Sequence, residues 1–301
     1  MSVLEVKGIK KTFGTQEVLK GLDFSLPEQS VLGFIGQNGA GKTTFMKLIV
    51  GLLASDEGTI SVCGEKVQYG NTKTNRLIGY LPDVPEFYGY MTAYGYLTLC
   101  GEVTGLTGIE IKEKATELLK LVGLENNKKK IKTYSRGMKQ RLGIAQALLN
   151  EPKLLICDEP TSALDPLGRK EILEILHRVK KQTTVIFSTH ILSDVEKICD
   201  HIVLLHEGTI KLSMTLAEME ARFSFNQLLV EFNQSLSTAD YESIFEGLRV
   251  TNKGETYLVQ HDELTEIQTK LYTRFINQGI FPKKIEVYQP SLEDIFTEVV
   301  Q

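Results

Sequence analysis

Residues 36–44, GQNGAGKTT, constrain this sequence more than any other stretch. They follow the short apolar run VLGFI and precede the helical pattern FMKLIVGLL. A loop that wraps phosphate groups must bring backbone N–H groups close to them, which favours glycine. A lysine in the loop can contact the β- and γ-phosphates, and the next hydroxyl can ligate Mg²⁺. The pattern therefore predicts a site for the phosphates of ATP and for Mg²⁺ formed by Gly36, Gln37, Asn38, Gly39, Ala40, Gly41, Lys42, Thr43 and Thr44, with Thr43 on the metal.

A second candidate site lies in LLICDE, residues 154–159, where four apolar residues lead to two acids. Catalytic groups gather at the carboxyl ends of parallel strands. Asp158 would hold Mg²⁺, directly or through water, and Glu159 would act as general base on the attacking water. Taken alone, the segment is equally well an ordinary strand that ends in surface acids. Together with the upstream glycine-rich loop, it favours the catalytic interpretation.

The order of expected elements predicts an α/β domain followed by a smaller one. Short β-branched runs alternate with helical patterns, which is typical of a largely parallel central sheet. Residues 90–150 are mostly helical in pattern and form an insertion. Beyond residue 213 the order becomes βαββαβα, which fits a small α+β domain of ferredoxin-like type. We therefore expect one domain over 1–213 and a second over 214–301.

Composition excludes several other classes of protein. The formal net charge of −4 gives no indication of nucleic acid as a partner. The four cysteines form no CxxC pair, so neither a zinc site nor a disulfide framework is expected, and a reducing cytosol is the natural setting. No apolar stretch approaches the roughly 18 residues that a membrane-spanning helix requires. We expect no direct membrane insertion.

Residues 133–152, TYSRGMKQRLGIAQALLNEP, resemble the signature motif of ABC (ATP-binding cassette) proteins and the helix that follows it. Ser135 and Gly137 match the family pattern, whereas Tyr134, Arg136 and Met138 replace its leucine, glycine and glutamine. The resemblance implies that Ser135, Arg136 and Gly137 contact ATP held by a second subunit. In isolation, the segment would be a serine-capped helix.

Three further motifs follow the same family order. SALD, residues 162–165, resembles the D-loop, and STH, residues 188–190, resembles the switch-histidine motif. The resemblance implies that His190 contacts the γ-phosphate and holds the attacking water with Glu159. Phe13 resembles the aromatic residue that stacks on adenine. Without the family pattern, His190 would be assigned a structural role and Phe13 a core position.

The segment IGYLPDVPEFYGYMT, residues 78–92, resembles the family's Q-loop region but carries Asp83 where glutamine is usual. That glutamine reaches Mg²⁺ and the attacking water. An aspartate is an adequate oxygen ligand for Mg²⁺, so we expect Asp83 to contact the metal and the nucleotide. It also adds negative charge beside the phosphates.

The resemblance covers about residues 3–215 and implies a P-loop NTPase cassette with a core parallel sheet, an N-terminal antiparallel β part and a helical insertion. It implies an ATPase that pairs with a second ATP-binding subunit, expected as a homodimer, and with a separate polytopic membrane subunit at the inner, cytoplasmic face of the membrane. The closing PSLEDIFTEV, residues 290–299, resembles the end of an extension found in bacterial and archaeal exporters.

Two alternatives remain at this point. A soluble ABC ATPase that acts on ribosomes or DNA would need no membrane partner, although ribosome-acting members generally carry two cassettes. A non-catalytic regulator would lack the catalytic acid, yet Glu159 is present. The transported cargo is not specified by the sequence.

Overall fold

The computed structural model describes residues 2–70, 72–125, 128–223, 227–288 and 290–300. The chain divides into two compact units, residues 1–216 with 299–301, and residues 217–298. The boundary expected after residue 213 falls inside strand β10 (Thr209–Thr215), where Ser213 pairs with Val203 and Thr215 with His201. We therefore propose a boundary after residue 216, because those strand hydrogen bonds join residues 214 and 215 to the first unit.

An antiparallel sheet forms the N-terminal part of the first unit, in the order β2-β1-β4-β5. Its strands are β1 (Ser2–Phe13), β2 (Gln16–Pro27), β4 (Glu57–Val62) and β5 (Glu65–Lys66). Buried and exposed side chains alternate along much of β1 and β2, as they do in a sheet with one covered face. This is the antiparallel part that the family resemblance implied.

The central sheet has six strands in the order β10-β9-β3-β8-β7-β6. Besides β10, they are β3 (Val31–Ile35), β6 (Ile78–Leu81), β7 (Leu154–Asp158), β8 (Thr184–Thr189) and β9 (His201–His206). All pair in parallel except β10, which lies antiparallel at one edge. Every residue of β3, β7 and β8 is buried, which requires cover on both faces.

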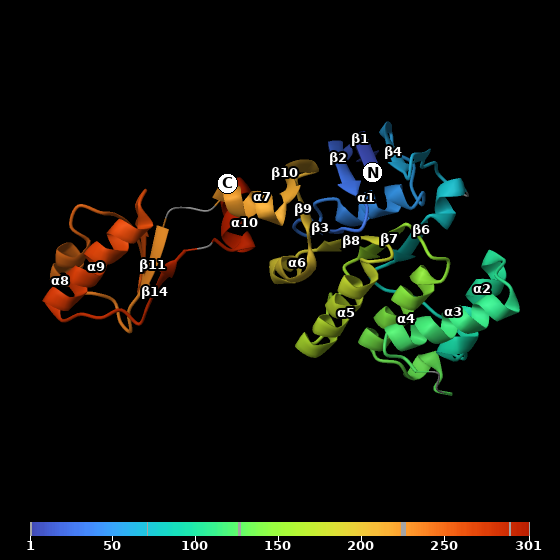
Figure 1. Ribbon diagram of the computed structural model, residues 1–301. Helices are drawn as coiled ribbons and strands as arrows, with labels where there is room; N and C mark the ends of the chain where they lie inside the picture. The colour runs from blue at the N-terminus through green and yellow to red at the C-terminus, as the bar shows by residue number, and fades with distance from the viewer. Residues whose placement is uncertain (1, 71, 126–127, 224–226, 289, 301) are drawn as a thin grey trace. The chain divides into compact units, whose positions relative to one another are not determined.

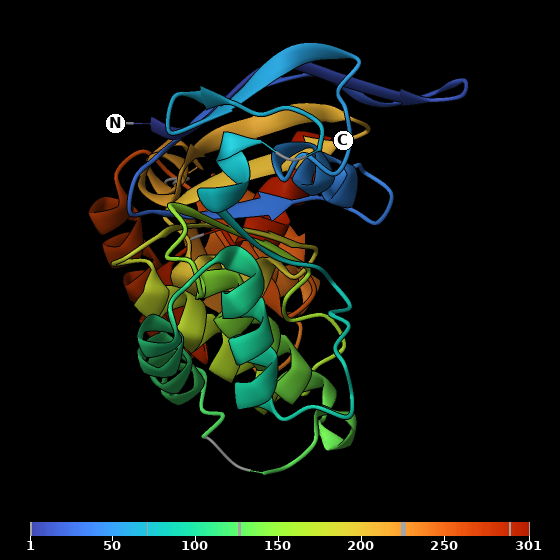
Figure 2. The same cartoon turned by 90° about the vertical axis from the view of Figure 1, so that its right-hand side faces the viewer.

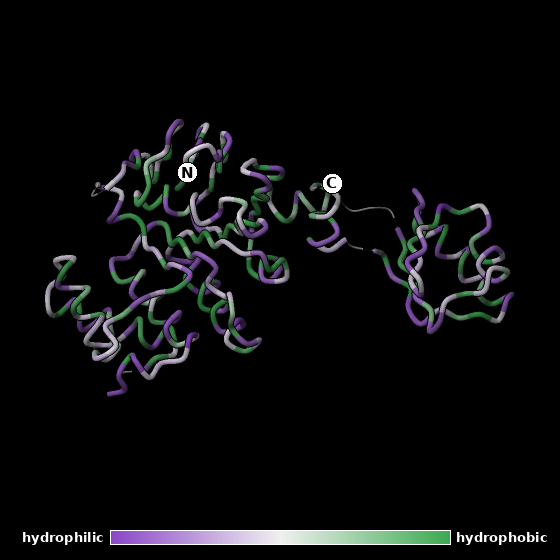
Figure 3. The backbone as a smooth tube through the Cα atoms, turned by 180° about the vertical axis from the view of Figure 1, so that it is seen from behind, coloured by the Kyte–Doolittle hydropathy of each residue, from purple (hydrophilic) through white to green (hydrophobic). Residues whose placement is uncertain are grey.

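Helices supply that cover. Helix α1 (Lys42–Ile49) lies between the two sheets, and α5 (Pro166–Val179) and α6 (Leu192–Ile198) lie on the other side of the central sheet (Figure 1). Neighbouring residues of β3 show both contacts. The Phe34 ring stacks on Phe45 of α1 with centroids 4.9 Å apart, whereas a Cβ at Gly33 would come within 2.7 Å of Val195 on α6. Hydrophobic segments gather along the middle of this unit in Figure 3.

The expected helical insertion contains α2 (Ala93–Thr104), α3 (Gly108–Leu121) and α4 (Arg136–Leu148). Each begins at a hydroxyl side chain, that of Thr92, Thr107 or Ser135, which accepts a backbone N–H three residues further along the chain. A short 3₁₀ helix, η1 (Lys73–Arg76), precedes β6, and a second, η2 (Ile131–Thr133), lies within the insertion between α3 and α4. Figure 2 shows the insertion and the N-terminal sheet at opposite ends of the cassette.

The second unit confirms the expected ferredoxin-like arrangement. Its antiparallel sheet has the order β12-β13-β11-β14, with helices α8 and α9 in the two crossovers. The core combines Tyr257 and Phe275 with apolar residues of β11. Residues 224–226, expected within its first strand, lie outside the described part. The elements are α7 (Leu216–Phe223), β11 (Gln227–Glu231), α8 (Thr238–Phe245), β12 (Arg249–Lys253), β13 (Thr256–Gln260), α9 (Leu264–Gln278), β14 (Lys284–Val287) and α10 (Leu292–Val300).

Candidate active site

The glycine-rich loop joins β3 to α1, and two of its glycines are fixed by geometry. A Cβ at Gly36 would come within 2.6 Å of the Leu205 carbonyl oxygen. Gly41 has φ 109°, and a Cβ there would come within 2.7 Å of Leu19 Cδ2. No L side chain fits either position without moving its neighbours. The backbone therefore passes close to β2 and β9 and delivers α1 with its N-terminus at the loop.

Lys42, the first residue of α1, is folded back into this loop. Its Nζ donates to the carbonyl oxygens of Gly36 at 2.7 Å and Gln37 at 3.3 Å. The side chain is only 6% exposed, and Nζ lies 3.2 Å from Oε1 of Glu159. A buried ammonium is stable only with such partners. Lys42 is thus held at the centre of the loop, next to the acidic end of β7.

The acidic end of β7 is organised by Ser188, on the neighbouring strand β8. Ser188 Oγ donates to Oδ1 of the buried Asp158 at 2.6 Å and accepts the Glu159 backbone N–H at 2.9 Å. Our sequence interpretation assigned no role to Ser188. The available signal was its position two residues before His190, since residues at i and i+2 of a strand face the same side of the sheet.

Glu159 leaves the strand in an unusual conformation, with φ 48°. Left-handed backbone is costly for a non-glycine residue and is typical of functional sites. The turn places the Glu159 carboxylate between the side chains of Lys42 and His190. Oε1 contacts Lys42, and Oε2 lies 3.0 Å from Nδ1 of His190. The predicted base and the predicted switch histidine are therefore in direct contact.

A cleft of about 480 Å³ brings most of the predicted residues together. It opens beside the glycine-rich loop and reaches from the end of β1 to the segment after β8. Val18 and Ser162 also line it, and neither was foreseen. The lining residues are Phe13, Val18, Asn38, Gly39, Gly41, Lys42, Thr43, Thr44, Asp83, Glu159, Ser162 and His190. The described lining does not include four of the predicted residues, which belong to the same loop and to the end of β7: Gly36, Gln37, Ala40 and Asp158.

Phe13 occupies the last position of β1 and is 47% exposed, unlike the core residue that its type alone predicts. Lys11 Nζ lies 5.4 Å from the centroid of the Phe13 ring, within the range of a cation–π contact. Asp56 ties this strand end down, because its carboxylate accepts Lys11 Nζ and the Thr12 N–H, each at 2.6 Å. The ring is thus an exposed aromatic surface at the mouth of the cleft.

Asp83 lines the cleft, but its carboxylate already has a partner. Arg136 Nη2, at the start of α4, lies 3.2 Å from Asp83 Oδ1. Gln140, one turn further along α4, donates its Nε2 to the Asp83 carbonyl oxygen at 2.6 Å. The expectation that Asp83 simply replaces a metal-binding glutamine therefore omitted an ion pair that only the fold reveals.

The signature residues lie at the start of α4. Ser135 is its N-cap and accepts the Met138 N–H at 3.2 Å, as the simple capping alternative required. A Cβ at Gly137 would have only Leu164 Cδ2 within 4 Å among the described atoms, at 3.8 Å. Among the described residues, those lining the cleft do not include Ser135, Arg136 or Gly137. Ser135 and Gly137 are thus not part of the lining of their own chain's cleft, whereas Arg136 contacts that lining through Asp83.

The donor set fits Mg²⁺ together with a nucleotide. Thr43, with its hydroxyl, and Asp83, with its carboxylate, line the cleft. Asp158 is the last residue of β7, directly before Glu159 of the same cleft. The part of the chain that is described holds no cluster of three His, Cys, Asp or Glu side chains suited to a metal. Mg²⁺ at phosphate sites needs none, because it takes one or two carboxylates and completes its shell with phosphate and water.

Two ionisable side chains beside Asp158 remain uncharged at neutral pH. Burial raises the pKa of Tyr80 to about 12, and the charge of Asp158 acts in the same direction. Burial, followed by the charge of Asp158, also raises the pKa of the Cys157 thiol. Neither group therefore competes with Asp158 as an anion for a cation in the cleft.

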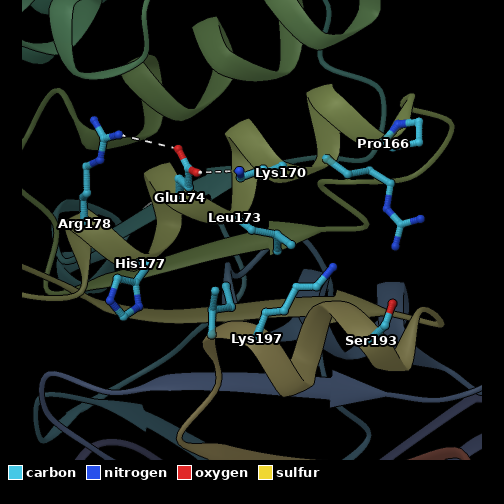
Figure 4. Close-up of a pocket in the computed structure, with 10 residues that line it drawn as sticks. Pro166, Lys170, Leu173, Glu174, His177, Arg178, Ser193 and Lys197 are labelled. Carbon is cyan, nitrogen blue, oxygen red and sulfur yellow. Dashed lines mark ion pairs between the residues drawn. The ribbon is translucent and has the colours of Figure 1, made fainter.

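A larger cavity, of about 810 Å³, lies between α5 and α6 (Figure 4). Its polar lining comes from both helices, and on α5 Glu174 pairs with Lys170 at 3.9 Å and with Arg178 at 3.7 Å. It contains neither the glycine-rich loop nor the acidic strand end. We therefore place the nucleotide in the smaller cleft, which is lined by the glycine-rich loop and by Glu159.

None of the helices in the described ranges is both long and apolar enough to cross a lipid bilayer.

Comparison with known proteins shows the family to which the chain belongs. The family model described as "ABC transporter" matches residues 19–162. The chain is 38% identical to the uncharacterized ABC transporter ATP-binding protein YxlF of Bacillus subtilis (strain 168) over 301 residues, 99% of each chain. It is 34% identical to the bacitracin transport ATP-binding protein BcrA of Bacillus licheniformis, covering 99% of this chain and 97% of that one.

Solved structures lead to the same family. An ATP-binding subunit of an ABC transporter has a TM-score of 0.66 and 35% identity, covering 73% of this chain and 93% of that one. The cassette MJ0796, in a dimeric post-hydrolysis state bound to ADP and Pi, has a TM-score of 0.64 and 26% identity, covering 71% and 98%. With its cleft, its glycine-rich loop and its relatives along the full length, this chain belongs to the ATP-binding proteins of ABC transporters.

Proposed function

We propose that this protein is the ATP-hydrolysing motor subunit of an exporter. The observation that carries the proposal is the contact chain Lys42–Glu159–His190 inside the cleft. It combines a cation for phosphate, a carboxylate base and a histidine at hydrogen-bonding distances. Ordinary ATP-binding proteins without hydrolysis have no need of a strained carboxylate aimed at the phosphate site.

In the proposed reaction, a water oxygen attacks the γ-phosphorus and the bond to the bridging oxygen of ADP breaks. Glu159 accepts a proton from this water, and His190 orients the Glu159 carboxylate and contacts the γ-phosphate. Lys42 exchanges its contact with Glu159 for the β- and γ-phosphates. Bound Mg²⁺, held by Thr43, Asp158 and Asp83, would neutralise charge on the phosphate oxygens. Phe13 would stack on the adenine.

We further propose a sandwich of two subunits, most simply a homodimer. Ser135, Arg136 and Gly137 do not line the cleft of their own chain, and the N-terminus of α4 is a favourable place for an anion. The dimeric state of the MJ0796 cassette bound to ADP and Pi supports this arrangement. ATP would favour the closed pair because its γ-phosphate contacts both halves, and hydrolysis would release them.

Export is supported by the names of relatives, and a membrane partner by one exposed surface. Relatives include a bacitracin transport protein and the linearmycin resistance ATP-binding protein LnrL of Bacillus subtilis (strain 168), 40% identical over 68% of this chain and 67% of LnrL. Just after Asp83, the chain exposes Tyr88 at 55% and Tyr90 at 70%. Aromatic residues are enriched at protein interfaces. We propose that this segment docks on a separate polytopic membrane subunit, at the cytoplasmic face of the membrane.

The decisive experiment is ATP-dependent dimerisation of Glu159→Gln, measured by light scattering beside the wild type. Removing the base slows hydrolysis, so ATP should trap a stable dimer in this variant and not in the wild type. Glu113→Gln, at an exposed position of α3, is the matched control and should behave as wild type. If Glu159→Gln binds ATP but stays monomeric, the sandwich proposal for the isolated subunit fails.

The trans contact is tested by adding Gly137→Glu to Glu159→Gln. Because the described atoms leave open space at Gly137, this substitution should preserve the fold but block a facing subunit. Gly108→Glu is the control: a Cβ at Gly108 meets none of the described atoms within 4 Å, and a Cβ at Gly137 meets only Leu164 Cδ2 among them, at an ordinary contact distance of 3.8 Å. We expect the ATP-dependent dimer to disappear only with Gly137→Glu. A dimer that survives this change would place the interface elsewhere.

A further inference from the structure

Helix α4 holds Asp83 through two independent contacts. The Arg136 guanidinium pairs with the Asp83 carboxylate at 3.2 Å, and the Gln140 amide binds the Asp83 backbone carbonyl at 2.6 Å. Residues four apart lie on the same face of a helix, so one side of α4 presents both groups. Asp83 is therefore the residue through which the loop after β6 contacts the N-terminal part of α4.

The two contacts have different environments. Gln140 is fully buried, so its hydrogen bond fixes the path of the loop. The ion pair is half exposed, with 42% of the Arg136 side chain and 47% of the Asp83 side chain accessible. Exposed pairs of this kind add little to stability. The ion pair therefore needs a reason other than holding the fold together.

The composition of the pair suggests that reason. Asp83 and Arg136 are both departures from the family pattern, which has glutamine and glycine at these positions, and the fold places the two departures in contact. Asp83 also lines the cleft beside Thr43 and Glu159. An unpaired carboxylate there would repel the phosphates of a nucleotide.

We infer that Arg136 is a positioning residue whose charge compensates Asp83, so that an anionic nucleotide can occupy the cleft beside an aspartate. In the same way, Asp83 keeps the Arg136 side chain within its own subunit. This inference rests on the proposed nucleotide site. It assigns to Arg136, the third residue of the signature motif, a role within its own chain, toward the loop that carries Asp83.

The test measures equilibrium binding of a fluorescent ADP analogue in EDTA, so that neither hydrolysis nor Mg²⁺ contributes. Arg136→Gln should weaken binding about three- to tenfold at low salt, the size expected for one charge near a protein surface. The loss should shrink at high salt, because salt screens exposed charges. Arg136→Lys should recover much of the affinity. With Mg²⁺ present the loss should be smaller, because the freed carboxylate can then face a cation.

The second half of the test is the double variant. Asp83→Asn should restore near-wild-type affinity to Arg136→Gln, because the uncompensated charge is then gone. Arg178→Gln, exposed on α5, changes the net charge equally and should have no effect. If the loss persists in the Asp83→Asn background, or if Arg136→Lys binds as weakly as Arg136→Gln, the compensation inference is wrong.

The outcomes separate this inference from the proposed function. Lys42→Ala should abolish binding if the cleft is the nucleotide site, whatever Arg136 does. Failure of that control would overturn the site itself. A different result is that Lys42→Ala loses binding of the analogue while the effects of Asp83→Asn and Arg136→Gln on its affinity simply add. That result would leave the ATPase proposal intact and reject only the charge compensation.

Discussion

Ser188 Oγ donates a 2.6 Å hydrogen bond to Oδ1 of Asp158 and also accepts the N–H of Glu159. One hydroxyl on β8 therefore fixes both acids at the end of β7. Asp158 and Ser188 are direct partners across the parallel ladder, so strand pairing brings them together. Ser188 therefore orients the carboxylate of the proposed metal ligand and holds the backbone of the proposed base, whose own carboxylate contacts Lys42 and His190.

Ser188→Ala should reduce the rate of ATP hydrolysis while leaving nucleotide binding largely intact. A hydrogen bond to a charged group contributes about 1.5–3 kcal/mol, which corresponds to roughly a 10- to 100-fold fall in kcat if it orients the reacting groups. Steady-state phosphate release checks this, with Ser193→Ala on α6 as the control. A variant with wild-type kcat would show that Ser188 has no part in catalysis.

Phe13→Ala should weaken ATP binding without lowering stability, because the ring is 47% exposed. Stacking of a base on an aromatic side chain contributes about 1–3 kcal/mol, so the Kd should rise accordingly. Phe13→Tyr should retain the affinity, and Tyr69→Ala, an exposed aromatic residue outside the cleft, should have no effect. Calorimetric titration distinguishes these cases. An unchanged Kd in Phe13→Ala would remove Phe13 from the site.

Asp56→Asn should loosen the strand end that carries Phe13, with a defined pH dependence. The hydrogen bond from Lys11, followed by that from the Thr12 amide, lowers the pKa of Asp56 below its usual 3.8. Stabilisation by a group whose folded-state pKa is lowered is complete above the unfolded pKa and is lost as the pH falls through the folded value. The difference in unfolding free energy between wild type and Asp56→Asn should therefore stay constant from about pH 8 to about pH 5 and shrink below about pH 4.

Denaturant titrations at several pH values measure that difference directly. Glu113→Gln removes an exposed carboxylate elsewhere in the first unit and should change the unfolding free energy far less than Asp56→Asn at neutral pH. A difference that grows as the pH falls would contradict the assigned direction of the Asp56 pKa.

Phe275→Ala should destabilise the second unit selectively. Phe275 is 1% exposed and packs edge-to-face on Phe232, with ring centroids 5.9 Å apart. Truncating such a residue costs about 3–5 kcal/mol. Ile276→Ala is the matched control, because the next residue of α9 is 67% exposed. Hydrogen exchange should accelerate in β11 and β13 only with Phe275→Ala, and ATP binding should persist. Equal acceleration with Ile276→Ala would contradict the assigned core.

The sequence alone predicted most of the fold. Buried strands such as residues 31–35 and 154–158 were recognisable from their continuous apolar runs, because strands covered on both faces have no polar positions. Helix α9 is encoded just as locally: its buried residues Ile267, Leu271 and Phe275 recur at every fourth position, and Gly279, at φ 66°, ends it. Strand β10 was not predicted, because its pairing with β9 rather than a local pattern forms it.

For the site, the sequence by itself determined which chemical groups are present: the glycine-rich loop, Lys42, the acids at 158–159 and His190. Local chemistry sufficed because a phosphate loop needs small residues and a cation at a fixed spacing. Only the tertiary structure decided that Ser188 holds both acids and that Arg136 pairs with Asp83. Those contacts join residues 29 to 53 positions apart. They exist because strand pairing and helix packing bring those segments together, which no local pattern encodes.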